Sequence, residues 1–229
     1  MIDIHSHILP TIDDGSSGLE QSLQMIKESV EQGVTDIFLT PHYRNSYKLE
    51  REEVENVFEQ FKKVVQQQNI SVNLYLGQEV YVEKGIKDLL KENKVLTLNK
   101  SKYVLIEFDY IREREIAEVV YELKLLGYIP IVAHLERYAY ADIDTAMDIK
   151  DSGGLIQINA ASIANHDMKA KAKFVKKLIK NGLVDFVASD LHFNRENFMA
   201  KAYKIIAKKN GDQVAQDLFI NNAKAIIKG

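Results

Sequence analysis

The sequence predicts an α/β fold in which seven parallel strands close into a (β/α) barrel. Short apolar runs alternate with amphipathic helical segments along the 229 residues, a pattern typical of parallel sheets with helical crossovers. Polar residues follow most of these runs. In a barrel such strand ends converge on one mouth, whereas an open sheet would spread them along a line. The first strand is also not followed by a Gly-rich phosphate loop, which disfavours a dinucleotide-binding sheet.

The predicted strands are short apolar runs bounded by turn residues. After the opening residues, they lie at 34–40, 72–78, 103–106, 128–133, 155–158 and 184–189. Their length suits buried strands better than helices. Each of them leads into a polar residue, and this regularity gives the first indication of a site.

Helical segments separate the strands. The first has Leu23, Ile26 and Val30 at helical spacing and Gly33 as its stop, after a Ser17-to-Glu20 sequence typical of a capping box. The others are predicted at 50–68, 84–92, 114–126, 143–151, 169–180, 195–209 and 211–220. No linker, low-complexity stretch or change of composition divides the chain. We therefore expect a single domain over residues 1–229.

The composition excludes several kinds of protein. Hydrophobic residues make up 46% and charged residues 28%, as in ordinary globular proteins, and the net charge of −3 gives no reason to expect a nucleic-acid partner. The chain has no cysteine, which rules out disulfides, thiolate zinc sites and a cysteine nucleophile. There is neither a signal-peptide pattern nor an apolar run long enough to span a bilayer. We expect a cytoplasmic protein without membrane insertion.

The opening residues place two histidines two positions apart. On a strand, the side chains of His5 and His7 leave the same face, which presents two imidazoles to one metal ion. Two solvated histidines would have the same spacing, so the motif alone supports both interpretations. The loop that follows carries Asp13 and Asp14, and Asp13 suggests no role.

The later strands end in the same residue types, at His42, Glu79, Glu107, His134, Asp190 and His192. Any one of them could be a capping or solvated residue, but their coincidence favours a shared metal site. Imidazole and carboxylate without thiolate suit Mn, Fe, Zn or Mg ions, and Glu79 and Glu107 are candidates to bridge two ions. His166 lies in a loop outside this set, and we expect a structural or surface role for it.

Arginines near two of these strand ends could bind an anionic substrate. Arg137 and Arg195 could each grip phosphate oxygens with two hydrogen bonds, while Arg44 is a weaker candidate of the same kind. A surface salt bridge is the alternative for all three. Closely spaced metal ions can clamp a phosphoryl group during in-line attack. The residue types therefore point to phosphate-ester chemistry.

Five motifs together resemble the polymerase-and-histidinol-phosphatase (PHP) superfamily: Asp3-Ile4-His5-Ser6-His7, Pro41-His42, Glu79, His134-Leu135-Glu136-Arg137-Tyr138 and Ser189-Asp190-Leu191-His192. The fuller opening, from Asp3 through Pro10 to Ser16, is more particular. It resembles the manganese-dependent tyrosine-protein phosphatases of Gram-positive capsule and exopolysaccharide operons. The motifs occur in the family's order over nearly the whole chain.

The resemblance implies a distorted, TIM-like (β/α)7 barrel that holds three metal ions, with Mn²⁺ expected and Fe, Zn or Mg as alternatives. By that resemblance, one ion binds His5, His7, Glu79 and Asp190, a second binds Glu79, Glu107 and His134, and a third binds Asp14, His42 and His192. Arg137 and Arg195 match the family's phosphate-binding positions. Leu135 replaces a frequent proline and Phe193 a frequent polar residue, which affects the expected fine specificity.

The activity implied by the resemblance is that of a metal-dependent protein-tyrosine phosphatase. A metal-bound hydroxide would attack phosphorus directly, and Asp190 or a metal-bound water would protonate the phenolate. The implied substrate is a phosphotyrosine protein, the tyrosine-rich tail of a bacterial tyrosine kinase that controls polysaccharide export. Two alternatives remain open. One is a histidinol-phosphatase-like enzyme or phosphodiesterase of the same superfamily, and the other is a non-catalytic metal-binding module.

Overall fold

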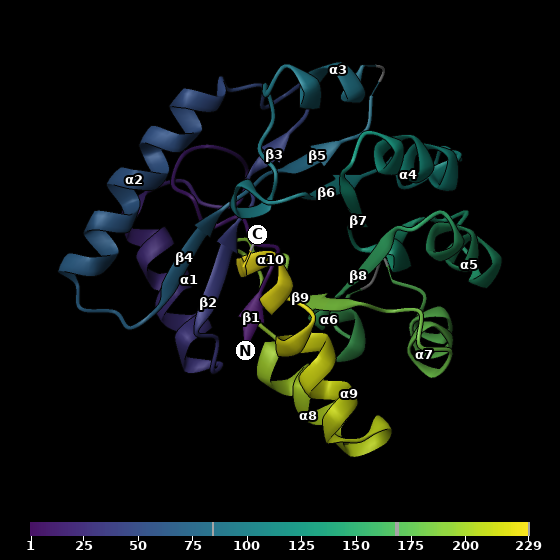
Figure 1. Cartoon of the computed structure of the whole chain (residues 1–229). Helices are drawn as coiled ribbons and strands as arrows, with labels where there is room; N and C mark the ends of the chain where they lie inside the picture. Colours follow the sequence, from purple (N-terminus) through teal and green to yellow (C-terminus); the bar gives the residue numbers. More distant parts are fainter. Residues whose placement is uncertain (84, 168–169, 229) are drawn as a thin grey trace.

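Parallel strands curl into a distorted barrel with helices around it in the computed structural model, which describes residues 1–83, 85–167 and 170–228 (Figure 1). The described strands are β1 (Ile2–Asp3), β2 (Asp36–Leu39), β3 (His42–Tyr43), β4 (Asn73–Leu76), β5 (Glu79–Tyr81), β6 (Tyr103–Glu107), β7 (Ile129–Val132), β8 (Leu155–Asn159) and β9 (Phe186–Ala188). Each predicted strand is present, and the (β/α) barrel prediction is confirmed.

The helices also follow the predicted order. They are α1 (Leu19–Glu31), α2 (Arg51–Gln67), α3 (Ile86–Lys91), α4 (Ile116–Leu125), α5 (Ile143–Asp151), α6 (Ala160–Ile163), α7 (Ala172–Lys180), α8 (Met199–Asn210), α9 (Asp212–Gln216) and α10 (Lys224–Lys228). Lys84 and Lys169, the first residues of two predicted helices, lie outside the described residues. Among the helices that are described, none is both long and apolar enough to cross a bilayer.

Two of the seven predicted strands are interrupted. The sheet pairings are β1-β2-β4 and β3-β5-β6-β7-β8-β9, so β3 continues β2 after Pro41, and β5 continues β4 after Gln78. Pro41 has no N–H to donate to a neighbouring strand, which weakens the ladder at this point. The Glu79 N–H still donates to the Pro41 carbonyl at 3.1 Å, so the register carries across the break. The interruptions place His42 and Glu79 at the starts of new strand segments.

The first and last strands close the barrel at their C-terminal ends. Ser6 forms a parallel bridge with Leu191, and the His7 N–H donates to the Leu191 carbonyl at 2.9 Å. The Asp190 N–H donates to the His5 carbonyl at 2.9 Å. Closure of the barrel therefore places the first motif, residues 3–7, beside the last motif, residues 189–192.

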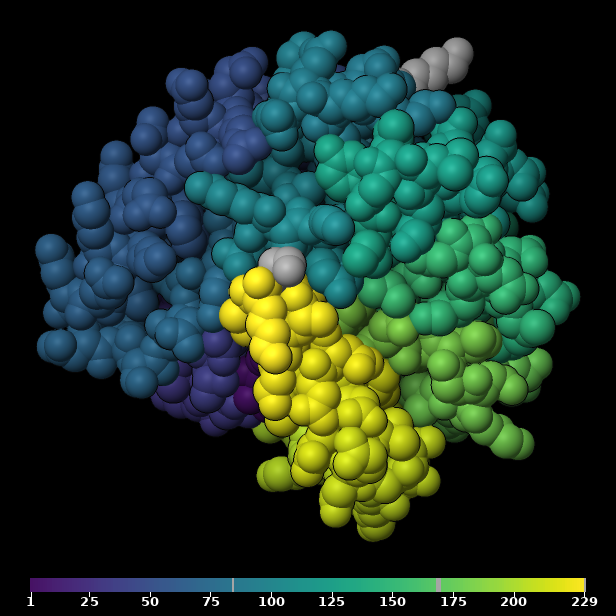
Figure 2. All heavy atoms as spheres, viewed as in Figure 1, coloured from purple at the N-terminus to yellow at the C-terminus, as the bar shows by residue number. Residues whose placement is uncertain are grey.

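Apolar residues fill both sides of the strands. In β6, Val104 and Ile106 belong to the larger core against the helices, whereas Leu105 packs with Phe38 and Ile131 in a second core. This alternation follows from the period of two in a strand and places the second core inside the barrel. Ile226 of α10 also belongs to it. The C-terminal helices accordingly lie across the middle of the face seen in Figure 2.

The capping box predicted before α1 is wrong. Gly18 precedes the helix, no side chain caps it, and Leu19 is 46% exposed. The turn is held instead by Ser16, whose hydroxyl donates to the Gly18 carbonyl at 3.0 Å and accepts from the Ser22 hydroxyl at 2.8 Å. The serine one residue earlier therefore organises the turn.

Leu105 tests the assignment of the barrel interior. It is fully buried, whereas Leu125 on α4 is 69% exposed. We expect Leu105→Ala to lower the free energy of unfolding by about 2–5 kcal/mol because it leaves a cavity. The matched control Leu125→Ala should change it by less than about 0.5 kcal/mol. Urea denaturation of both variants measures the difference, and equal effects would contradict the assignment.

Candidate metal centre

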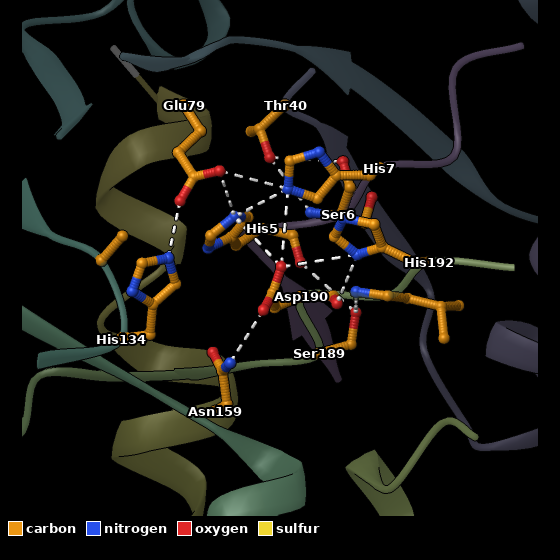
Figure 3. Close-up of polar contacts among 12 residues, drawn as sticks. His5, Ser6, His7, Thr40, Glu79, His134, Asn159, Ser189, Asp190 and His192 are labelled. Atoms are coloured by element: carbon orange, nitrogen blue, oxygen red, sulfur yellow. Dashed lines mark hydrogen bonds and ion pairs between the residues drawn. The ribbon is translucent and has the colours of Figure 1, made fainter. Parts of the chain in front are cut away.

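The nine predicted metal ligands meet at the C-terminal mouth of the barrel. They come from the loop after β1 (His5, His7, Asp14), the starts of β3 and β5 (His42, Glu79), the end of β6 (Glu107) and the residues after β7 and β9 (His134, Asp190, His192). Figure 3 shows most of these side chains pointing toward one another. Apart from Asp14, all of them are buried.

Glu79 lies at the centre of the group. Its Oε2 is 3.4 Å from His5 Nε2, 3.3 Å from His7 Nε2 and 2.8 Å from His42 Nδ1. Its other oxygen, Oε1, is 2.7 Å from His134 Nε2. Four imidazoles from three strand ends therefore surround one carboxylate, as Figure 3 shows for three of the imidazoles.

One set of atoms fits a single ion closely. The Nε2 atoms of His5 and His7 are 3.1 Å apart, and Asp190 Oδ1 lies 3.7 and 3.5 Å from them. Ligands bound at about 2.0–2.2 Å to one ion lie roughly 3–3.5 Å from each other. Among the described residues, Glu79 Oε2 and Glu107 Oε2 are buried without a hydrogen bond. Buried carboxylate oxygens of this kind fit a cation, so the residues present suit a metal cluster.

The other candidate sets overlap. Asp14 Oδ1 lies 3.5 Å from His42 Nε2 and 3.6 Å from His192 Nε2, and His7 can join this set. His134 Nε2 lies 3.7 Å from Glu107 Oε1. His42 Nδ1 faces both glutamates, so His42, Glu79 and Glu107 form a further possible set. The ligand grouping for each ion stays a prediction.

Asp13, for which no role was predicted, holds two of the candidate ligands. Its Oδ2 lies 2.7 Å from His7 Nδ1 and accepts the His42 N–H at 2.9 Å. Its Oδ1 accepts the Gly15 N–H at 2.9 Å, and a Cβ at Gly15 would overlap the His7 carbonyl. A carboxylate behind a ligating histidine fixes the ring and its tautomer. The signal in the sequence was a second aspartate beside Asp14.

Gln157 has a similar position behind two other histidines, and the sequence analysis missed it. Its Oε1 lies 3.1 Å from His5 Nδ1 and accepts the His134 N–H at 3.0 Å. Its amide donates to Asn159 Oδ1 at 2.8 Å, and Asn159 donates to Asp190 Oδ2 at 2.9 Å. A polar residue inside the apolar run 155–158 was the available signal.

The two predicted phosphate-binding arginines meet at Asp190. Arg137 and Arg195 both donate to Asp190 Oδ2, and the Arg137 Nε donates to Asp167 at 2.6 Å. Arg137 is buried, while the Arg195 side chain is 43% exposed. Arg44 lies apart from them, with its Nη2 3.4 Å from Asp14. The pair at Asp190 therefore borders the metal centre on one side.

The carboxylates of the centre differ in their electrostatics. Burial opposes the charge of Glu79, yet His5 and His42 hold its pKa well below the ordinary value. Burial and the charge of Glu79 together raise the pKa of Glu107 to about 8. Burial also opposes the charge of Asp190, but Arg137 and His5 keep its pKa well below the usual range. Glu79 and Asp190 therefore favour the ionised form, whereas Glu107 favours the protonated form below about pH 8.

Two of the candidate ligands lie at strained backbone positions. His134 has φ 35° and Asp190 has φ 50°, in the left-handed region that side chains disfavour. Each such residue costs of order 1–3 kcal/mol, and such costs are typical of functional sites. Each residue lies two positions after the end of a strand, at the mouth of the barrel.

Comparison with known proteins agrees with this geometry. The family described as capsular polysaccharide synthesis, CpsB/CapC, matches residues 1–228. The chain belongs to the CpsB/CapC family. The family resemblance seen in the sequence is thereby confirmed, and the match extends through the C-terminal helices.

Relatives within the CpsB/CapC family include named phosphatases. The tyrosine-protein phosphatase CpsB of Streptococcus agalactiae is 36% identical, covering 100% of this chain and 98% of the relative. YwqE of Bacillus subtilis, a tyrosine-protein phosphatase, is 33% identical over 100% of this chain and 92% of the relative. A chain from the crystal structures of B. subtilis YwqE and Streptococcus pneumoniae CpsB, described as unique metal-dependent tyrosine phosphatases, has a TM-score of 0.87 at 33% identity. That likeness covers 94% of this chain and 90% of the solved one.

Substitution of Asp13 tests whether residues that contact the proposed ligands are needed for metal binding. We expect Asp13→Asn to weaken metal binding by about 10–100-fold because His7 loses its carboxylate partner. Isothermal titration of the metal-free protein with Mn²⁺ measures the change. The control Asp144→Asn removes an exposed carboxylate on α5 and should leave the affinity unchanged. Equal affinities for both variants would rule out this role for Asp13.

The raised pKa of Glu107 predicts a pH dependence of metal binding. Burial and Glu79 shift it from 4.5 to about 8, so the metal-free protein carries a proton on Glu107 below that pH. A bound cation must displace this proton, and apparent affinity should therefore rise as pH increases toward 8. Titrations between pH 6 and 8 in buffers of different ionisation enthalpy would detect the released proton. Glu107→Gln should reduce the proton release, and unchanged release would contradict the assignment.

Proposed function

We propose that the chain, as a single PHP-type domain over residues 1–229, is a metal-dependent protein-tyrosine phosphatase, a phosphoric monoester hydrolase. The observation that carries this proposal is the buried cluster of imidazoles and carboxylates around Glu79, with two arginines at its border. Full-length similarity to named tyrosine-protein phosphatases supports the substrate class.

The proposed metal ligands are the nine residues His5, His7, Asp14, His42, Glu79, Glu107, His134, Asp190 and His192. We propose Mn²⁺ as the metal, in a three-ion cluster, because mixed imidazole and carboxylate ligands suit it. When bound, such ions supply Lewis-acid catalysis and an activated water for attack on phosphorus. Asp13 and Gln157 position the histidines of this set.

Arg137 and Arg195 are proposed to bind the phosphate oxygens. Guanidinium groups bind phosphate bidentately and stabilise the negative charge of an in-line displacement. Both arginines reach the border of the cluster through their contact with Asp190. Because the pKa of Asp190 is held well below its usual range, Asp190 stays ionised. A solvent molecule therefore fits the role of proton donor to the leaving group better than Asp190 does.

Aromatic side chains at the rim support an aromatic leaving group. The Tyr47 ring is stacked with His42 at 6.1 Å between centroids, and Tyr110 lies 5.5 Å from His134. Both tyrosines are partly exposed, so each offers ring surface beside the cluster. A phosphotyrosine ring that enters between them can make aromatic contacts while its phosphate reaches the metal centre.

The family description supports a proposal for the partner. Because the family is described by capsular polysaccharide synthesis, we propose that the substrate is a phosphorylated tyrosine kinase that regulates this process, recognised through its tyrosine-rich tail. A cytoplasmic location, where such a tail would be reached, is part of the same proposal.

Turnover of defined substrates tests the function. The Mn²⁺-loaded protein should hydrolyse a phosphotyrosine peptide with a clearly higher kcat/KM than histidinol phosphate or a bis-aryl phosphodiester. Chelators should abolish the activity and thiol-alkylating agents should not, because the chain contains no cysteine. Preference for histidinol phosphate would reverse the substrate assignment.

A variant separates catalysis from simple metal binding. Glu79→Gln should reduce peptide turnover by more than about 100-fold, since losing even a residue behind a metal ligand costs 10–100-fold. The control variant Gln24→Glu changes an exposed residue of α1 and should keep full turnover after the same purification and metal loading. Unchanged turnover by Glu79→Gln in a metal-replete assay would refute the proposed mechanism.

A further inference from the structure

Helix α8 carries an exposed row of lysines. Lys201, Lys204 and Lys208 are exposed and follow one another at spacings of three and four, so they share one face of the helix. Within the described part of the chain, Lys204 and Lys208 have no ion-pair partner. Lys150, by contrast, pairs with Asp185 at 2.6 Å. We call the three residues the α8 lysine row.

A groove runs beside this row. A cavity of about 600 Å³ lies between α8 and Gln32 near the end of α1, and the three lysines and Glu196 are among its lining residues. Glu196 is the acidic residue in this lining, so the groove is strongly basic in a chain whose net charge is −3. Helix α8 forms the lower edge of the molecule in Figure 1.

The groove adjoins the proposed phosphate-binding arginines. A second cavity of about 500 Å³ is lined by Arg137, Arg195 and His166, together with Asp167 and Asp190, which pair with the arginines. It shares Glu196 and Phe198 with the first cavity. One continuous surface therefore leads from the border of the metal centre to the lysines of α8.

Lys201 stands where the two cavities meet. Its ammonium lies 3.0 Å from His166 Nε2 and 5.4 Å from the centre of the Phe198 ring. His166 is itself stacked on Phe198, with 4.3 Å between ring centroids. The first lysine of the row is therefore fixed beside the cavity of the arginines, while the other two lead away from it.

The dimensions suit a peptide. From Lys201 to Lys208 a helix rises by about 10 Å, a length that an extended chain spans with roughly three residues. A peptide whose phosphotyrosine is bound at the arginines and metal centre would pass these lysines with the residues next to the phosphotyrosine. Carboxylate side chains at those positions would complement the charge of the row.

We propose that the α8 lysine row binds acidic residues that flank the phosphotyrosine of a peptide or protein substrate. This inference rests on the proposed phosphatase function and adds a preference among its substrates. The continuity of the groove with the arginines favours a peptide over a lipid surface, because a membrane would contact the row without needing that continuity.

Paired peptides test the proposal. One phosphotyrosine peptide carries three glutamates on one side of the phosphotyrosine, the other carries three glutamines, and both N-terminal and C-terminal placements are made. The Mn²⁺-loaded enzyme should show a KM about three- to tenfold lower for one glutamate peptide than for its glutamine partner, since exposed ion pairs are modest individually. The preference should shrink at high salt. Equal KM values for all pairs would overturn the proposal.

Charge reversal locates the effect. Lys204→Glu/Lys208→Glu should abolish the preference for glutamate or reverse it toward lysine-flanked peptides, while p-nitrophenyl phosphate turnover stays unchanged. The matched control Lys176→Glu/Lys180→Glu makes the same charge change on the exposed face of α7 and should keep the preference. A preference that survives in the α8 variant, or is lost equally in the control, would refute the docking role.

Two further measurements separate the causes of failure. Fluorescence anisotropy with non-hydrolysable phosphonate peptides reports binding without turnover, so the preference can be seen even if the proposed activity is wrong. Vesicles of phosphatidylcholine and phosphatidylserine test the other possible partner. If the α8 variant loses vesicle binding and keeps its peptide preference, the row is a lipid-binding surface and the proposal is wrong.

Discussion

The structure depends on the need to neutralise the carboxylate of Glu79, which is fully buried at the mouth of the barrel. A buried carboxylate without compensation is very unfavourable, and Glu79 is surrounded by four imidazoles, two from the loop after β1, one from β3 and one after β7. The contact between the residues after β1 and those after β9 also brings Asp190 next to His5 and His7. Glu107 adds a second carboxylate nearby, and burial and the charge of Glu79 raise the pKa of Glu107 to about 8. Divalent cations would complete the charge balance.

The charged residues lie at the mouth of the barrel, and the apolar residues lie further inside it along the same strands. In β6, Leu105 packs inside the barrel and Glu107, two residues later on the same face, joins the metal centre. Likewise, β8 passes from an apolar start to Gln157 and Asn159 near its end. Because alternate residues of a strand share a face, each inward-facing row changes from apolar to polar as it approaches the mouth. The C-terminal helix covers the opposite end through Ile226.

Most of the ligand candidates could be predicted from the sequence because they follow apolar runs, and strand ends are readily recognised. Asp14, in the loop after the first strand, was named as a ligand only through the family resemblance. The grouping of ligands was harder to predict. His42 directs its two nitrogens at different carboxylates, Glu79 and Asp14, and only side-chain orientation in three dimensions reveals this. The role of Asp13 depends on a turn that Gly15 packs against His7, a contact that spacing does not predict. The capping box failed for a similar reason, since Ser16 forms the turn through its own hydroxyl.

Asp190 connects the metal centre with the proposed phosphate-binding arginines. Its Oδ1 faces His5 and His7, while its Oδ2 accepts hydrogen bonds from Arg137 and Arg195. Negative charge on one carboxylate is shared between these two sides, so a cation held at Oδ1 weakens the attraction of Oδ2 for the arginines. A cation at Oδ1 and a phosphate at the arginines would therefore both act on this one side chain.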